Sequence, residues 1–222
     1  TRLGYIPIPS FYLDNEEDNR LGCANDVAKE IIKLKKDSVK GILIDLRYNG
    51  GGSMREAMSL TGIFIDEGPV AIYKQRNKRP ILLKDINRGS IWDGPLVVMV
   101  NSGSASASEF VTAALQDYNR AVIVGSTTFG KGSAQNVMMA DSTDYRHRFS
   151  KAEGFSPYGY LKITCGKFYR VSLQSHQGKG IVPDISIPGL LERVGHKEKD
   201  YPYFLSADTV NKKVIYAKWS PL

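Results

Sequence analysis

The chain has 222 residues, of which 42% are hydrophobic, and a formal net charge of +7. A chain of this length buries roughly 70% of its unfolded surface, so it needs neither a metal nor a disulfide framework to fold. It contains no apolar run long enough to span a bilayer. The first residues, TRLGYIPIPSFYLD, are typical of a strand and not of a signal peptide, so we expect a domain cut from a longer protein.

Apolar periodicity predicts an alternation of strands and helices. We expect strands over residues 4–12, 41–48, 69–75, 95–100 and 121–126, a short strand after residue 80, and helices over residues 25–39, 54–65 and 107–120. Three of the strands are continuous apolar runs, which is typical of a buried parallel sheet. The expected fold class is therefore α/β with a mostly parallel central sheet.

Beyond Gln135 this alternation loosens. Residues 138–160 are polar and rich in turn formers, as in a lid or a surface excursion, and one more strand is expected over residues 161–173. The sequence from Gly189 onward is less regular. We expect a core domain over residues 1–190 and a C-terminal extension over residues 191–222 that packs on the core or follows it.

The excess positive charge has its densest local source in KQRNKRP, Lys74 to Pro80. A basic patch can bind nucleic acid, but no aromatic platform or nucleic-acid motif accompanies this one. A solvated loop is the favoured interpretation and a nucleic-acid contact is the alternative. We therefore expect no nucleic-acid partner.

Cysteine and histidine residues give no sign of a metal site. Cys23 and Cys165 have no zinc-type spacing, and the sequence leaves open whether they form a disulfide. His147, His176 and His196 lie in polar, loop-like sequence without an H-E-x-x-H spacing. The sequence therefore predicts three ordinary surface histidines and no metal.

Gly125, Gly130 and Lys131 have the spacing of a phosphate-binding loop, G-x-x-x-x-G-K. Such a loop needs Ser or Thr after the lysine to bind magnesium, and a helix whose N-terminus faces the phosphates. Here Gly132 follows the lysine, and GSAQNVMMADST is a poor helix. A nucleotide site is not expected, and a lysine in a glycine-rich turn is the simplest alternative.

A serine-rich turn, NSGSASASEF, joins the expected strand 95–100 to the next helix. Ser104, Ser106 and Ser108 alternate there with small residues, which would let a substrate backbone approach closely. A serine at a helix start also lies among unpaired amide N–H groups. Ser106 and Glu109 have the spacing of a capping box, worth about 1 kcal/mol of helix stability. Capping does not explain why the whole turn avoids bulky residues.

A glycine-rich turn, DLRYNGGGSM, follows the expected strand 41–48. Gly50, Gly51 and Gly52 predict a tight turn or close backbone packing. Their amides could also stabilise a developing negative charge. Gln135 follows Lys131 by four residues, and it could orient the lysine amine or be an ordinary surface glutamine.

Together these turns suggest a serine–lysine dyad. A serine hydroxyl is a poor nucleophile without a base, and lysine can be that base if its pKa, ordinarily roughly 10.4, is lowered by several units. Burial without a carboxylate partner lowers a lysine pKa, and residues 127–133 around Lys131 include no acid. The lack of a convincing histidine base agrees with this interpretation.

On these motifs the chain resembles the S41 family of serine peptidases, the C-terminal processing or tail-specific proteases, and above all their bacterial periplasmic branch. The resemblance covers most of Gly4 to Pro188 and rests on GILIDLRYNGGGS, NSGSASASEFVTAALQDYNRAVIVGSTTFGKGSAQ and LKITCGKFYRVSLQSHQGKGIVPDI. It implies a spiral β-α core of the Clp protease and crotonase type, protein or peptide substrates, no cofactor, and a periplasmic or cell-envelope location.

The resemblance also implies roles for particular residues. Ser106, the middle serine of SASASE, would be the nucleophile, Lys131 its base and Gln135 the third catalytic residue. The amides of Gly52 and Ala107 would form the oxyanion hole.

The resemblance gives Asp117 a further supporting role. Its place late in a helix, three residues before Arg120, favours a structural ion pair over proton transfer. The chain also departs from the family pattern, because nothing in it resembles the PDZ domain that normally precedes this core, and because Gly50 stands where many members have proline. We expect the PDZ domain upstream in the full-length protein.

The favoured prediction is an endopeptidase for proteins with unstructured or apolar C-terminal tails. A catalytically silent peptide- or ligand-binding relative on the same fold is the first alternative, and the joint presence of Ser106, Lys131 and Gln135 argues against it. A crotonase-like enzyme, which would bind a CoA thioester and leave proteins intact, is the second.

Overall fold

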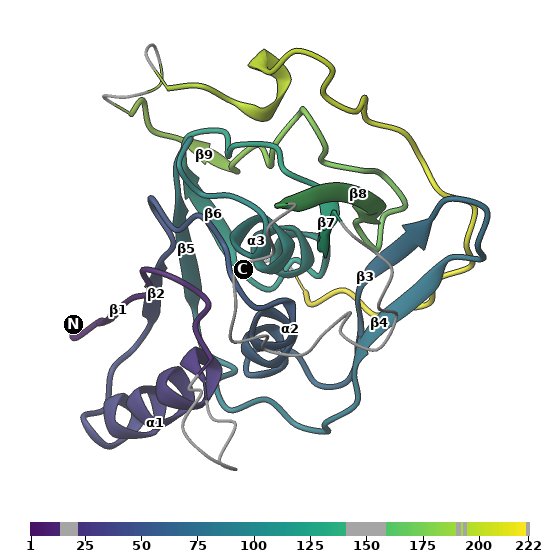
Figure 1. Ribbon diagram of the computed structural model, residues 1–222. Coiled ribbons are helices and arrows are strands. Elements are labelled where there is room, and N and C mark those ends of the chain that lie inside the picture. Colours follow the sequence, from purple (N-terminus) through teal and green to yellow (C-terminus); the bar gives the residue numbers. More distant parts are fainter. Residues whose placement is uncertain (14–21, 141–158, 190–191, 193–194, 221–222) are drawn as a thin grey trace.

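The computed structural model describes residues 1–13, 22–140, 159–189, 192 and 195–220, and two sheets enclose its two central helices (Figure 1). One sheet is parallel and has the order β1-β2-β5-β6-β9; the other is antiparallel and has the order β4-β3-β8-β7. The parallel sheet consists of β1 (Gly4–Pro7), β2 (Ile42–Asp45), β5 (Leu96–Val100), β6 (Val122–Gly125) and β9 (Ile185–Ser186). The antiparallel sheet consists of β3 (Gly68–Gln75), β4 (Ile81–Asp85), β7 (Ser133–Met139) and β8 (Tyr160–Tyr169).

The helices are α1 (Cys23–Lys36), α2 (Met54–Gly62), α3 (Ala107–Asp117) and a 3-10 turn, η2 (Glu198–Asp200). Helices α2 and α3 pack on each other between the sheets, while α1 lies against α2 and β1 at one end of the parallel sheet (Figure 1). Every residue of α3 except Gln116 is buried, as expected for a helix with a sheet on either side. The α/β fold with a parallel five-stranded sheet agrees with the sequence prediction.

The sequence predicted strands at β3, β4 and β8, but it did not predict β7 or the pairing of these strands in a second, antiparallel sheet. Strand β7, SAQNVMM, has no clear alternation, and it forms because Ser133 to Met139 pairs with Lys167 to Tyr160 of β8. The inner face of this sheet packs on α3, where the rings of Phe110 and Phe168 meet edge to face at 6.1 Å. The predicted excursion over residues 138–160 lies mostly outside the described residues.

The C-terminal segment runs over the outer face of the antiparallel sheet. Val210 packs against Ile72 and Tyr169 of that face. The backbone N–H of Trp219 donates to the Tyr118 carbonyl at 2.9 Å. These contacts favour an extension that packs on the core, and the division at residue 190 stays a prediction.

Both cysteines are free thiols, which answers the question that the sequence left open. Cys23 is buried at the start of α1, and this burial raises its pKa to about 12. Among the described residues, no helix is long and apolar enough to cross a membrane.

Arg120 does not pair with Asp117, so that part of the sequence prediction is wrong. The Arg120 side chain is only 2% exposed; it donates to the carbonyls of Phe64 at 2.8 Å and Trp92 at 2.6 Å. Its guanidinium carbon lies 4.5 Å from the ring centre of Trp219 in the C-terminal segment. Burial lowers the Arg120 pKa from its ordinary value, and the two carbonyls and the aromatic ring replace the lost water.

Arg120→Met should therefore lower the free energy of unfolding by about 3 kcal/mol, because it leaves two buried carbonyls without donors. Urea denaturation measures the change. Arg88→Met is the control, since Arg88 is 84% exposed and its ion-pair partner among the described residues is Glu67. This change should alter stability by less than about 0.5 kcal/mol. Equal stability of the two variants would contradict the structural role of Arg120.

Candidate active site

Gly52, Ser106 and Lys131 lie on three loops that leave the parallel sheet at one edge, while Gln135 lies on β7 and Ala107 and Asp117 lie on α3. Strands β2, β5 and β6 are neighbours and run parallel, so their carboxyl ends lie side by side. They lead into the glycine turn (residues 49–52), the serine turn (residues 101–106) and the lysine loop (residues 126–132), in that order. The fold thus brings together three segments that are far apart in the sequence (Figure 1).

Ser106 ends the serine turn in an unusual backbone conformation. Its φ is +57° and its ψ is −112°, a region that costs a residue other than glycine about 1–3 kcal/mol. Gly51 packs directly on it, since a Cβ on Gly51 would lie 2.9 Å from the Ser106 Cβ, and Gly51 itself has a φ of +107°. Strain of this kind is typical of a residue held in place for function.

Ser104 and Ser108, the neighbours that alternate with Ser106, have structural roles. Both side chains are fully buried. The Ser104 hydroxyl donates to the Leu46 carbonyl at 2.7 Å, and the Ser108 hydroxyl donates to the Asn49 carbonyl at 2.8 Å. Ser106 is half-buried and is the N-cap residue directly before α3. A capping role uses a lone pair of its oxygen and leaves the hydroxyl proton free. This answers why the turn avoids bulk: it is pressed against the loop after β2.

Asn49 fixes the shape of the glycine turn, and the sequence interpretation did not include this residue. It is fully buried; its side chain accepts the Gly51 N–H at 2.9 Å and donates to the Ile8 carbonyl at 2.8 Å. Among the described residues, no acceptor is found for the amides of Gly52 and Ala107. These are the two donors that the family resemblance assigns to an oxyanion hole.

Glu109 joins the serine turn to the lysine loop. Its carboxylate is fully buried, and its Oε2 accepts the backbone N–H groups of both Ser106 and Lys131, each at 2.8 Å. The other oxygen accepts the Gly130 N–H and the Thr128 hydroxyl, each at 2.6 Å. The backbone nitrogens of Ser106 and Lys131 are both 2.8 Å from this one oxygen, so these two backbone atoms lie at most 5.6 Å apart. The sequence indicated only a helix cap here.

The prediction that no acid lies near Lys131 is therefore wrong for its backbone, because the Glu109 carboxylate accepts the Lys131 backbone N–H. The Lys131 side chain itself is half-buried. No described Asp or Glu forms an ion pair with its amine. All four lone-pair sites of the carboxylate are used by N–H and O–H donors of the two loops.

Gln135 and Asp117 have partners other than those first considered. Gln135 donates to the Ser133 hydroxyl at 2.8 Å, and within the described residues it makes no hydrogen bond to Lys131. Asp117 does form an ion pair, but with Arg170, at 2.7 Å. Both oxygens of Asp117 accept from that guanidinium, an arrangement that suits a structural role.

The histidine prediction holds for one residue and is wrong for another. His196 is exposed, and His147 lies outside the described residues. His176 is only 4% exposed, and its Nε2 lies 3.3 Å from the Lys131 carbonyl oxygen. Lys131 is followed by strand β7 and not by a helix, which agrees with the prediction that no phosphate-binding loop is present.

A mostly apolar cavity of about 330 Å³ opens next to the segments that follow the glycine turn and the lysine loop. It is lined by Met54, Arg55, Met58, Tyr73, Leu83, Ala134, Asn136, Cys165 and Phe168. Met54 begins α2 just after the glycine turn, and Ala134 lies on β7 just after the lysine loop. The cavity is large enough for a side chain of a bound molecule.

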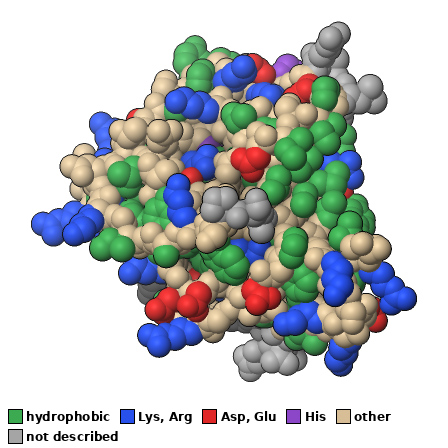
Figure 2. All heavy atoms as spheres, turned by 180° about the vertical axis from the view of Figure 1, so that it is seen from behind, with side chains coloured by type: hydrophobic (Ala, Val, Ile, Leu, Met, Phe, Trp, Pro, Cys, Tyr) green, Lys and Arg blue, Asp and Glu red, His purple; other side chains and the backbone are tan. Residues whose placement is uncertain are grey.

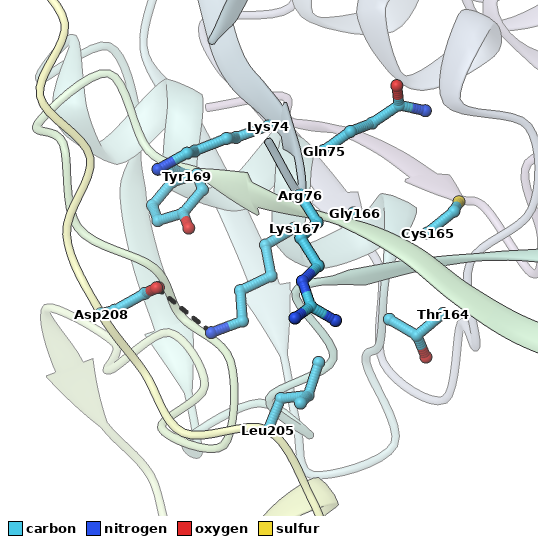
Figure 3. A pocket seen from close by; sticks show the side chains of 10 residues that line it. All are labelled: Lys74, Gln75, Arg76, Thr164, Cys165, Gly166, Lys167, Tyr169, Leu205 and Asp208. Atoms are coloured by element: carbon cyan, nitrogen blue, oxygen red, sulfur yellow. Dashed lines mark ion pairs between the residues drawn. The ribbon is translucent and has the colours of Figure 1, made fainter. Parts of the chain in front are cut away.

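The basic stretch Lys74 to Pro80 is only in part a solvated loop. Lys74 lies on β3 and is half-buried, and Arg76 follows the strand and is exposed. Both line a second cavity of about 390 Å³ on the outer face of the antiparallel sheet. Figure 3 shows Arg76 and Lys167 directed into that space, with Lys167 paired to Asp208 at 3.3 Å. On the face seen in Figure 2, lysine and arginine side chains are scattered among other groups and form no continuous basic surface.

Glu109→Gln should lower the free energy of unfolding by about 3 kcal/mol, because an amide has one acceptor oxygen and would turn an NH2 group toward buried N–H donors. Urea denaturation measures this loss. Glu30→Gln, at an exposed position of α1, is the control and should be nearly neutral. A Glu109→Gln variant as stable as the wild type would mean that the four hydrogen bonds do not hold the two loops together.

The sequence matches a known family and its curated members. Residues 2–187 match the model of peptidase family S41. The chain is 36% identical over 208 residues to the tail-specific protease of Haemophilus influenzae, and the aligned region covers 94% of this chain and 28% of that protein. It is 36% identical over 156 residues to the carboxy-terminal-processing protease of Bartonella bacilliformis, which covers 70% of this chain and 32% of that protein. The chain thus spans about a third of the length of these relatives or less.

Solved structures have the same fold. The photosystem II D1 C-terminal processing protease superposes with a TM-score of 0.66 at 26% identity, over 83% of this chain and 42% of that chain. Mature CPAF complexed with lactacystin gives a TM-score of 0.66 at 15% identity, over 84% and 47% of the two chains, which is a likeness of fold alone. The family match includes the glycine turn, the serine turn and the lysine loop. The chain belongs to peptidase family S41.

Proposed function

We propose that this chain is the catalytic core of a serine endopeptidase, with Ser106 as the nucleophile and Lys131 as the general base. The observation that carries the proposal is the shared contact at Glu109, whose one carboxylate oxygen accepts the amides of both residues. The strained backbone of Ser106 adds support. So do the structural roles of Ser104 and Ser108, because Ser106 is then the one of these three alternating serines whose hydroxyl donates to no acceptor among the described residues.

In the proposed reaction, the neutral amine of Lys131 takes the hydroxyl proton as the Ser106 oxygen attacks the scissile carbonyl. The amides of Gly52 and Ala107 bind the oxyanion of the tetrahedral intermediate. The protonated amine then gives its proton to the leaving nitrogen, and the peptide bond breaks to leave an acyl-enzyme. Water attacks this ester with Lys131 again as base, which releases the new carboxyl end and restores the serine.

Two further residues act at a distance in this proposal. Gln135 steadies the start of β7 through Ser133, directly after the lysine loop. The Asp117 carboxylate pairs with Arg170 and accepts a hydrogen bond from the Ser172 hydroxyl. Its proposed role is therefore to fix the segment after β8.

The apolar cavity beside the loops supports substrates with an apolar side chain next to the cleaved bond. Unstructured protein tails fit best, because an extended backbone can bring a free carbonyl to the Ser106 hydroxyl and to the Gly52 and Ala107 amides, whereas the backbone groups of a folded segment are already paired. The relatives named for tail-specific and carboxy-terminal processing agree with this substrate class. An upstream PDZ domain and a periplasmic or cell-envelope location belong to the same proposal and rest on the family resemblance.

Ser106→Ala and Lys131→Ala should each abolish cleavage of an unfolded protein such as casein, by at least about a thousandfold. Both should keep the wild-type circular dichroism spectrum, since neither side chain is a core residue. Labelling with a fluorophosphonate, which reacts with an activated serine, should be lost in both. Cleavage at the wild-type rate in either variant would end the dyad assignment, and a wild-type protein that binds but never cleaves peptides would favour the silent relative.

Leu83→Trp should narrow the apolar cavity, because Leu83 lines it from β4. We expect kcat/KM to fall by about tenfold or more for a peptide with Phe at the acyl side of the cleaved bond, and to stay within about twofold for the same peptide with Ala. Lys84→Trp is the matched control, since Lys84 is the next residue on β4 and is exposed. An equal loss for the Phe and Ala peptides would contradict a role of this cavity in substrate choice.

A further inference from the structure

The C-terminal extension reaches the lysine loop at a turn that lies outside the family match, which ends at residue 187. The Glu198 N–H, in η2, donates to the Phe129 carbonyl at 3.1 Å. The ring of Tyr201 lies against that of Phe129, with 6.4 Å between the ring centres. The extension therefore covers the loop on the side away from α3.

Gln177 carries this contact from the extension to the residue after Lys131. Its side chain is fully buried. Its Oε1 accepts the Gly132 N–H at 2.7 Å, and its Nε2 donates to the Glu198 carboxylate, also at 2.7 Å. The chain of hydrogen bonds runs from Glu198 through Gln177 to Gly132, with short bonds at both steps.

The Glu198 carboxylate decides which way the Gln177 amide points. A side-chain amide has a donor end and an acceptor end of nearly the same shape, so packing alone cannot orient it. A carboxylate only accepts, and it therefore binds the NH2 end and turns the oxygen toward Gly132. In the opposite orientation the NH2 group would face the Gly132 N–H, and two buried donors would oppose each other.

The segment around Gln177 holds each of the three residues centred on Lys131. The Gly178 N–H donates to the Gly130 carbonyl at 2.7 Å, and His176 Nε2 lies 3.3 Å from the Lys131 carbonyl. Glu109 binds the N–H groups on the other side of this loop. The backbone that carries the lysine is thus clamped from both sides, and Glu198 completes the outer side.

We propose that Glu198 is a positioning residue for the peptidase reaction. Through the Gln177 amide it fixes the loop that aims the Lys131 amine at Ser106. The extension is then part of the catalytic machinery of this protein, although it lies beyond the matched family domain. This inference rests on the proposed Ser106–Lys131 dyad.

The test compares variants of the intact protein on a short peptide substrate. Glu198→Ala should lower kcat about tenfold with KM within about twofold, because the lysine is misplaced while the substrate contacts remain. Glu198→Gln keeps an oxygen that can accept from Gln177, so its kcat should stay within about twofold of wild type. Asp208→Asn is the matched control, since it removes a carboxylate from the same extension that pairs instead with Lys167.

A double-mutant cycle shows whether the two residues act as one unit. Gln177→Ala should cost about as much kcat as Glu198→Ala, and the double variant should cost no more than either single change. Melting temperatures are recorded for every variant. Additive losses, a loss that only follows the unfolded fraction, or a wild-type kcat for Glu198→Ala would each overturn the proposal.

The Ser106→Ala and Lys131→Ala variants separate this proposal from the dyad itself. If both are inactive while Glu198→Ala has the wild-type kcat, the dyad stands and the positioning role is wrong. If either cleaves at the wild-type rate, the dyad and the positioning role are both wrong.

Discussion

The structure of this site depends on one buried carboxylate. Glu109 lies between the two segments that carry Ser106 and Lys131, and its four hydrogen bonds replace the water that an ionised acid would otherwise require. Three of the donors belong to the lysine loop and one to the serine turn. A single side chain on α3 therefore sets the separation of two loops that follow different strands of the parallel sheet, and neither loop could move away without leaving a buried charge unsatisfied.

The sheet brings the loops of the site together, and hydrogen bonds such as those of Glu109 fix their positions. The parallel strands bring three loops to one edge of the sheet. The strands do not by themselves fix the conformation of these loops. Backbone hydrogen bonds then fix the details: Asn49 shapes the glycine turn, and Gln177 closes the far side of the lysine loop. The groups proposed to react are left with few bonds of their own, while the backbone around them has many. This arrangement suits a reaction that needs placement more than movement.

The sequence predicted the elements whose pattern is local and missed those that depend on a distant partner. Strands β2, β5 and β6 are apolar runs, and the loops after them are recognisable from glycine and serine alone. Strand β7 has no such pattern and exists because β8 lies beside it. The buried state of His176 and the partners of Arg120 were missed for the same reason, since polar residues in loop-like sequence look exposed until tertiary contacts cover them. Glu109 was found by its spacing, but three of its four partners lie about twenty residues away in the chain.

Cys165 of β8 lines both the apolar cavity near the loops and the second cavity, on the outer face of the antiparallel sheet. Its sulfur donates to the Ala134 carbonyl and lies 3.5 Å from the Tyr73 hydroxyl. A bulky group attached to this thiol would occupy space that the substrate is proposed to use. Loss of activity after treatment with maleimides would then reflect a blocked cavity, and such sensitivity would not make the protein a cysteine peptidase.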